Sequence, residues 1–207
     1  MSRADAVAPF LAMSMAAKAG AAQAAGQSVV RFDVGQPVGG APAGALQHLG
    51  GLLTHEPLGY TDALGSLALR AGISRHYQST YGISIDPRRV VITTGASGGF
   101  ILAFLAALPD RGRVALASPG YPPYRHILTA LGFAPAVCSA DAATAMQLTP
   151  EHVQHAHRKA PLAAALVASP ANPTGTMLDR GALGALAAVC RDLDIPLISD
   201  EIYHGLD

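Results

Sequence analysis

The feature that most constrains the fold is a regular alternation of short β-rich runs with helix-length segments from about residue 86 onward. A strand, a crossover helix and a second strand in this order form a parallel pair. Five runs are predicted strands, over residues 90–94, 114–118, 134–138, 163–169 and 196–199. Four predicted helices lie between them, over residues 97–108, 122–131, 150–159 and 179–192. The fold class is therefore α/β, with a parallel-rich sheet and crossover helices.

The start of one helix is marked by three consecutive residues. Thr149 offers a hydroxyl cap, Pro150 fits the first helical position, and Glu151 places an acid in the first turn. These residues predict a helix that begins at Pro150.

The chain before residue 86 lacks this alternation. Residues 4–25, rich in Ala and Met, predict an amphipathic, surface-docked helix, and a second helix is expected over about 61–81. We divide the chain into an N-terminal helix and arm, 1–45, and an incomplete large domain, 46–207. The sequence is expected to be cut short, because parallel sheets commonly continue and the last predicted strand ends eight residues before the sequence does.

Charge and hydropathy argue against two classes of partner, nucleic acids and membranes. The sequence holds 14 Lys or Arg and 14 Asp or Glu residues, for a formal net charge of +0, without a basic cluster. Proteins that bind a nucleic-acid backbone carry a basic surface, so we expect no nucleic-acid partner. An uninterrupted apolar run of about 18 residues is also missing, so we expect no membrane span.

Cysteine and histidine residues do not indicate a disulfide framework or a metal site. Cys138 and Cys190 form no CxxC pair and are expected to be buried, reduced thiols. His152, His155 and His157 share one helical segment, but no Cys or acid completes a ligand set. Because the N-terminus also lacks a signal-type cleavage site, we expect a cytoplasmic protein.

The loop after the first predicted strand can bind an anion. Residues 93–100 read TTGASGGF, and small side chains such as Ala96, Ser97 and Gly98 let the amides of a helix N-terminus approach a phosphate. Tight strand-to-helix turns also need glycine for steric reasons, so this signal alone leaves both interpretations open. Neither G-x-G-x-x-G nor G-x-x-x-x-G-K-[ST] occurs, which disfavours a nucleotide as the ligand.

The same loop matches G-x-S-x-G, the elbow of a serine hydrolase, with Ser97 as nucleophile. Such an enzyme needs an acid and a histidine later in the chain. At the end of a later strand the sequence offers only Asp200 and His204, four residues apart and poorly placed for Ser97. A hydrolase is therefore an unfavoured alternative.

Three later loops place single polar or aromatic residues just after a predicted strand, where ligands of α/β sheets bind. Tyr121 can stack on a flat ring or pack at the base of its loop. Asn172, between two prolines, can bond a ligand or form an ordinary turn. Asp200 can cap a helix or pair with a buried cation.

In this order, GASGG, SPGYPPY, SPANPTG and SDEIY resemble the motifs of the class I/II aminotransferases, which are pyridoxal-phosphate enzymes of fold type I related to aspartate aminotransferase. The resemblance runs from about Val34 to the end of the chain. It implies the fold type I large domain, truncated here before its C-terminal half, with bound pyridoxal 5'-phosphate. It also implies transfer of an amino group between an amino acid and a 2-oxo acid. Noncatalytic truncated paralogues or fragments, and fold type I carbon–sulfur lyases or synthases, are the alternatives.

The resemblance also implies roles for individual residues. Ala96, Ser97 and Gly98 match the turn that binds the cofactor phosphate, and Tyr121 matches the aromatic residue that stacks on the pyridine ring. Asp200 matches the acid that pairs with the pyridine nitrogen.

Four further matches complete the implied site. Asn172 and Tyr203 match the residues that bond the ring hydroxyl oxygen. Gly35 matches the glycine near the substrate carboxylate. Tyr60 matches a tyrosine that reaches the phosphate of a neighbouring subunit, so a homodimer is implied.

One family residue is missing from this sequence. The family attaches its cofactor through a Schiff-base lysine that follows the SDEIY strand in a Ser-rich motif. The sequence contains only Lys18 and Lys159, and neither follows such a motif. We therefore assign no catalytic residue and expect these 207 residues to be inactive alone.

Overall fold

The computed structural model describes residues 3–35, 39–57 and 59–206, and the chain divides into two compact units. One unit is Pro9–Thr93, and the other comprises Met1–Ala8 with Thr94–Asp207. The second unit, called the sheet unit below, contains the strands. The boundary predicted between residues 45 and 46 remains a prediction.

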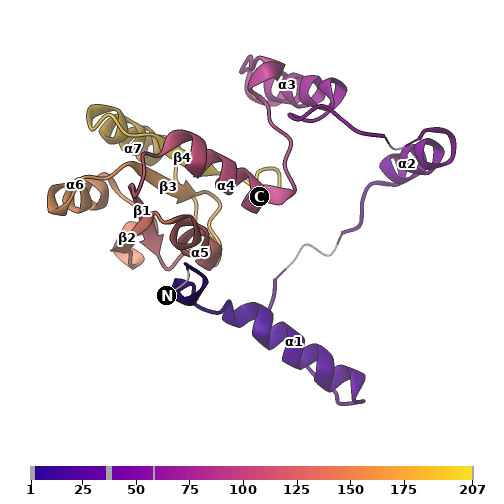
Figure 1. Ribbon diagram of the computed structural model, residues 1–207, viewed down its shortest axis with the longest axis horizontal. Coiled ribbons are helices and arrows are strands. Elements are labelled where there is room, and N and C mark those ends of the chain that lie inside the picture. The colour runs from indigo at the N-terminus through magenta and orange to yellow at the C-terminus, as the bar shows by residue number, and fades with distance from the viewer. Residues whose placement is uncertain (1–2, 36–38, 58, 207) are drawn as a thin grey trace. The chain divides into compact units, whose positions relative to one another are not determined.

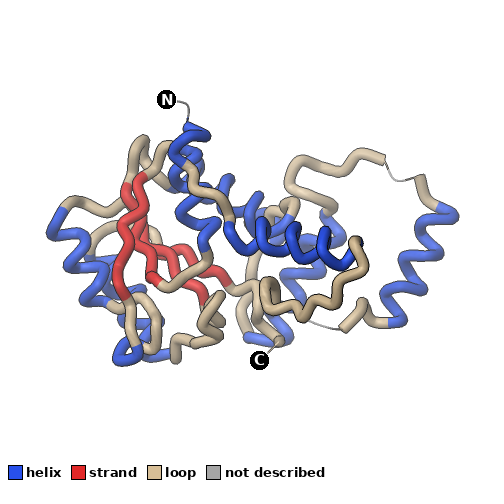
Figure 2. Tube along the Cα trace, turned by 90° about the horizontal axis from the view of Figure 1, so that it is seen from below, coloured by secondary structure: helices blue, strands red, loops and turns tan. Residues whose placement is uncertain are grey.

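The sheet unit is built on four parallel strands in the order β2-β1-β3-β4 (Figures 1 and 2). These are β1 Arg113–Ser118, β2 Ala134–Ser139, β3 Ala164–Ala168 and β4 Leu197–Asp200. All three pairings are parallel. The predicted α/β class and four of the five predicted strands are therefore confirmed.

Helices cover both faces of this sheet, because successive side chains of a strand point to opposite faces. Val114 and Leu116 of β1 pack in a core with α4 Gly95–Ala107 and α5 Pro122–Leu131. Ala115 packs in the other core, with α6 Pro150–Lys159 and α7 Arg180–Asp192. The predicted bounds of α5 and α6 are reproduced, and α4 and α7 differ by at most two residues.

The start of α6 follows the predicted capping pattern. Thr149 is the N-cap, its hydroxyl accepts the N–H of His152, and Pro150 is the first helical residue. Nδ1 of His152 accepts the N–H of Thr149 at 3.2 Å, and Nδ1 of His157 accepts that of Leu162 at 3.3 Å. These two histidines therefore hold the backbone at the two ends of α6.

Both cysteines are buried thiols, as predicted. Cys138 and Cys190 lie in the core between the sheet and α6 and α7. Burial raises the pKa of each thiol.

The other unit contains three helices, α1 Leu11–Ala24, α2 Ala43–His55 and α3 Leu67–Tyr81. The expected amphipathic character of α1 is wrong. Its exposed residues Leu11 and Met13 are separated by about 200° around the helix, so they share no face, and no residue of α1 is buried. Three short 3-10 helices complete the described elements, Arg3–Ala6, Pro87–Arg89 and Ala142–Thr144.

The strand predicted over residues 90–94 is also wrong. A strand needs a neighbour that takes up its backbone groups, and this segment lies in no sheet. Instead, the N–H of Ile92 donates to the carbonyl oxygen of Leu64 at 3.0 Å. Buried Arg70 donates to the carbonyl oxygens of Gly65 and Pro87 and so holds the same region together.

None of the helices in the described ranges has both the length and the apolar character to cross a membrane.

Candidate functional site

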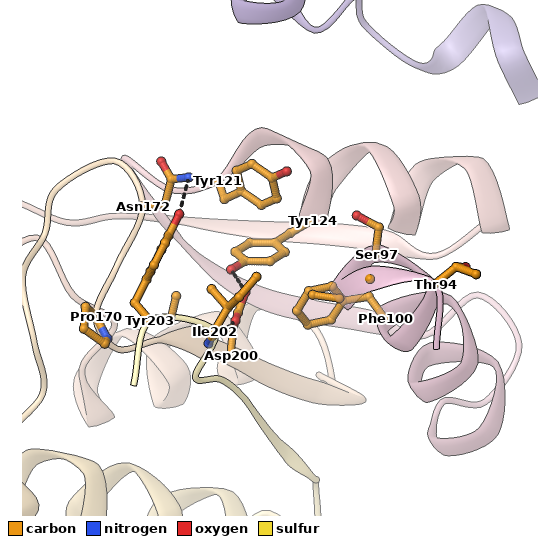
Figure 3. Close-up of a pocket in the computed structure, with 13 residues that line it drawn as sticks. Thr94, Ser97, Phe100, Tyr121, Tyr124, Pro170, Asn172, Asp200, Ile202 and Tyr203 are labelled. Atoms are coloured by element: carbon orange, nitrogen blue, oxygen red, sulfur yellow. Dashed lines mark hydrogen bonds between the residues drawn. The ribbon is translucent and has the colours of Figure 1, made fainter. Parts of the chain in front are cut away.

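A cavity of about 200 Å³ lies at the edge of the sheet where β3 and β4 end (Figure 3). Parallel register brings these ends together, since Ala168 pairs with Asp200 and the N–H of Ser169 donates to the carbonyl oxygen of Asp200 at 3.1 Å. The lining residues come from the start of α4, the start of α5 and the loops after β3 and β4: Thr94, Gly95, Ala96, Ser97, Phe100, Tyr121, Tyr124, Ala168, Pro170, Asn172, Asp200, Ile202 and Tyr203.

One wall of the cavity is the first turn of α4. Thr94 is the N-cap residue but makes no side-chain hydrogen bond to that turn, and Gly95 has a φ of +76°. Ala96 and Ser97 line the cavity, and Gly98 follows them in the helix. The first N–H groups of a helix have no intrahelical acceptor and carry the positive end of its dipole. This wall therefore suits an anionic group.

An acid lies deep in the cavity. Asp200, the last residue of β4, is 9% exposed. Its Oδ2 accepts the hydroxyl of Tyr124 at 2.5 Å, and its Oδ1 accepts the N–H of Ile202 at 3.1 Å. Within the described ranges, no Lys or Arg forms a salt bridge with this carboxylate. The cavity therefore presents a buried carboxylate to a cationic or N–H-bearing ligand.

Sequence reasoning missed Tyr124, which holds this acid. The residue is 6% exposed and packs edge-to-face on Phe100, with ring centroids 5.1 Å apart. Burial, and then the hydrogen bond to Asp200, raise the pKa of Tyr124 far above its usual range. The hydroxyl is therefore a proton donor at any physiological pH. The only signal in the sequence was a second tyrosine three residues after Tyr121.

Tyr121 lies half-buried at the N-cap of α5 and meets Tyr124 edge-to-face, with centroids 5.3 Å apart. Burial raises its pKa, with smaller contributions from the charges of Tyr203 and Asp200. An aromatic ring that lines a cavity next to a buried acid can cover the face of a flat ligand.

Asn172 and Tyr203 form the opposite side of the cavity. The Asn172 Nδ2 donates to the Tyr203 hydroxyl oxygen at 3.3 Å (Figure 3). One residue comes from the loop after β3 and the other from the turn after β4, so the adjacent strands bring them together. The pair offers both a hydroxyl and an amide to a polar ligand atom.

The structure thus brings together six of the residues selected from the sequence: Ala96, Ser97, Tyr121, Asn172, Asp200 and Tyr203. Gly35 and Tyr60 belong to the other unit, and both are exposed to solvent. The individual roles predicted for all these residues remain predictions.

The contacts at Asp200 do not favour a serine hydrolase. Its carboxylate bonds Tyr124 and Ile202, whereas Nδ1 of His204 lies 3.6 Å from Glu201 Oε2. The acid–histidine pair that would activate Ser97 is therefore not formed among the described contacts.

The fold is that of a family of transferases. The family model described as aminotransferase class I and II matches residues 27–206. The chain therefore belongs to this family, whose members depend on pyridoxal phosphate.

Known relatives support this assignment along the whole chain. Valine–pyruvate aminotransferase of Mycobacterium tuberculosis is 44% identical over 97% of this chain and 51% of its own length. A crystal structure of an aminotransferase from the same organism matches with a TM-score of 0.91, at 44% identity over 98% of this chain and 52% of that one. Aspartate aminotransferase from Thermus thermophilus, solved with maleate, matches with a TM-score of 0.92, at 26% identity over 99% of this chain and 53% of that one. The chain thus spans about half the length of these relatives.

Proposed function

We propose that this chain forms the ring and phosphate pocket of a pyridoxal-phosphate aminotransferase, which exchanges an amino group between an amino acid and a 2-oxo acid. The observation that carries the proposal is a cavity in which three features meet: a buried carboxylate with no salt bridge to a described Lys or Arg, an aromatic wall and the start of a helix. Family membership gives the reaction class.

The residues present fit the chemical groups of pyridoxal phosphate. Its phosphate suits the N–H groups at the start of α4, its flat ring suits Tyr121, and its ring nitrogen suits the buried carboxylate of Asp200. Asn172 and Tyr203 can bond the ring hydroxyl oxygen. The phosphate, the ring nitrogen and the ring hydroxyl therefore each have a complementary group in the cavity, whereas the aldehyde has none among the described lining residues.

Each of these residues has a defined task in such a site. Asp200 holds a proton on the ring nitrogen, because a neighbouring anion stabilises the protonated form. Tyr121 shields one face of the ring from water, while Asn172 and Tyr203 fix its rotation. When bound, the cofactor supplies an electron sink for the carbon that carries the amino group.

The cavity holds no lysine among its described lining residues, and the two lysines of the sequence are exposed on helices, Lys18 on α1 and Lys159 at the end of α6. We propose that the 207 residues alone bind the cofactor noncovalently and do not turn over substrate.

Substrates and assembly are part of the same proposal. The name of the 44% identical relative makes valine and pyruvate the pair to assay first in a form of the protein that contains a cofactor lysine. Tyr60 of one copy would contact the phosphate bound by a second copy, which makes the working enzyme a homodimer with shared sites.

Binding of pyridoxamine 5'-phosphate to the 207-residue chain tests the proposal. This probe carries the ring and phosphate but no aldehyde, so it cannot react with exposed lysines. We expect Asp200→Asn to raise its Kd by about tenfold or more, because a hydrogen bond to a charged group contributes about 1.5–3 kcal/mol. Asp192→Asn, at an exposed position on α7, is the matched control and is expected to leave the Kd unchanged.

Two results would contradict the proposal. One is a wild-type chain that does not bind the probe, or that binds it as well after Asp200→Asn. The other is turnover of valine and pyruvate by the 207 residues that Asp200→Ala abolishes, since the chain would then replace the missing lysine by other means.

A further inference from the structure

The carboxylate of Asp200 is held by two donors from different parts of the fold. Oδ1 accepts the N–H of Ile202 from the turn after β4, and Oδ2 accepts the hydroxyl of Tyr124 from α5. The Ile202 bond fixes only one of the two oxygens. The Tyr124 bond, which spans 76 residues of sequence, fixes the second oxygen and with it the plane of the carboxylate.

The Tyr124 hydroxyl is fixed in turn by the packing of its ring. Phe100 and Tyr121 both contact this ring edge-to-face, with interplanar angles of 76° and 79°. The side chain belongs to the core between the sheet and helices α4 and α5. Because a tyrosine has few rotatable bonds and this one is enclosed, its hydroxyl cannot follow the carboxylate elsewhere.

The two bonds still leave Asp200 able to accept a ligand. A carboxylate has about four acceptor positions, and the described contacts use two. Since Asp200 and Tyr124 both line the cavity, the remaining positions are available to a ring N–H at this place. Without Tyr124 the carboxyl group could rotate about the Cβ–Cγ bond, as no described Lys or Arg holds it.

We propose that Tyr124 is a positioning residue of this site, whose buried hydroxyl orients the Asp200 carboxylate toward the ring nitrogen of the bound cofactor. The inference rests on the proposed function, because it assumes a pyridine ring in the cavity. Tyr121 and Tyr124 then act from the same end of α5, one on the face of the ring and the other through the acid that meets its nitrogen.

Pyridoxamine 5'-phosphate labelled with 15N in its ring tests this role without any requirement for activity. Tyr124→Phe removes only the hydroxyl and is expected to raise the Kd by about tenfold. The 15N resonance of the bound probe is expected to move away from its wild-type position toward that of the unprotonated ring. Tyr81→Phe, at an exposed position in the other unit, is the control and should change neither value.

A graded replacement separates positioning from a loss of packing. Site-specific 3-fluorotyrosine at position 124 keeps the ring and makes the hydroxyl a stronger donor. Because a stronger donor draws charge from the Asp200 carboxylate, the 15N resonance is expected to move toward that of the unprotonated ring even though the side chain stays packed, whereas an effect of packing alone would leave the resonance at its wild-type position. If circular dichroism shows that Tyr124→Phe does not fold, the fluorotyrosine variant alone provides the test.

The possible failures are distinguishable. If the wild-type chain does not bind the probe, both the proposed function and this inference are wrong. If the wild-type chain binds it and both Tyr124 variants retain the wild-type 15N resonance, the inference alone is overturned and the cofactor site stands.

Discussion

One buried side chain, Gln147, holds the loop that carries Asn172. Gln147 is 3% exposed, and its Nε2 donates to the carbonyl oxygens of Ala168 and Thr176 at 3.2 and 2.9 Å. It also donates to the Thr176 hydroxyl at 3.2 Å. Asn172 lies between these two attachment points, so the amide of Gln147 closes the base of its loop.

Replacing Gln147 with Met tests this attachment, because Met has a similar length and volume but no N–H. The amide nitrogen has two hydrogens, so at most two of its three contacts are complete hydrogen bonds at one time. At about 1 kcal/mol for each, Gln147→Met is expected to lower the free energy of unfolding by about 2 kcal/mol. Carbonyl oxygens left buried without a donor would increase this loss.

Urea unfolding followed by circular dichroism measures the effect on stability, and the Kd for pyridoxamine 5'-phosphate measures the effect on the site. We expect the Kd to rise, because a loosened loop no longer holds Asn172 beside Tyr203. Gln154→Met, the same change at an exposed position of α6, is the matched control. A loss below about 0.5 kcal/mol, no larger than that of an ordinary surface substitution, would refute the reasoning.

Two further predictions concern the other unit. Gly65 has a φ of +91°, and a Cβ there would lie 2.4 Å from Ile92 Cγ1. Gly65→Ala is therefore expected to lower the free energy of unfolding by about 3 kcal/mol, from backbone strain and from overlap of the new Cβ with Ile92 together. Gly82→Ala, at a φ of +69° with no atom near its Cβ, isolates the strain, and an equal loss in both variants in urea unfolding would show that Ile92 plays no part. The hydrogen bond from Arg88 lowers the pKa of Asp86 from 3.8 to about 2. The Asp86–Arg88 pair therefore stabilises the folded state above about pH 4, and this contribution is lost as the pH falls toward 2. In acid titrations of stability, the difference between the wild type and Asp86→Asn should shrink as the pH falls through that interval, and parallel curves would contradict this attribution.

The elements of the sheet unit were predictable because their signals are local. The cap of α6 involves Thr149 and the N–H group three residues later, so neighbouring residues alone determine where the helix begins. The strands β1 and β2 were found within a residue of their ends from short β-rich runs. In the same way, the order of four short motifs led to the residues that line the cavity.

Predictions failed where a distant part of the chain determines the outcome. Residues 90–94 have the composition of a strand, but they bond the loop at Leu64 instead of a neighbouring strand. The prediction for α1 failed for a different, local reason: its apolar residues are spread around the helix, so a composition rich in them produces no apolar face.

The sequence by itself determined the α/β class, the ends of the helices in the sheet unit and the residue types that line the cavity, since each depends on periodicity, caps or short motifs. The tertiary structure alone decided which of these groups meet. Asp200 is a strand-end acid in the sequence, and only the packing of α5 on the sheet shows that Tyr124 holds it. Contacts between residues far apart in the chain depend on strand order and register, which no local pattern encodes.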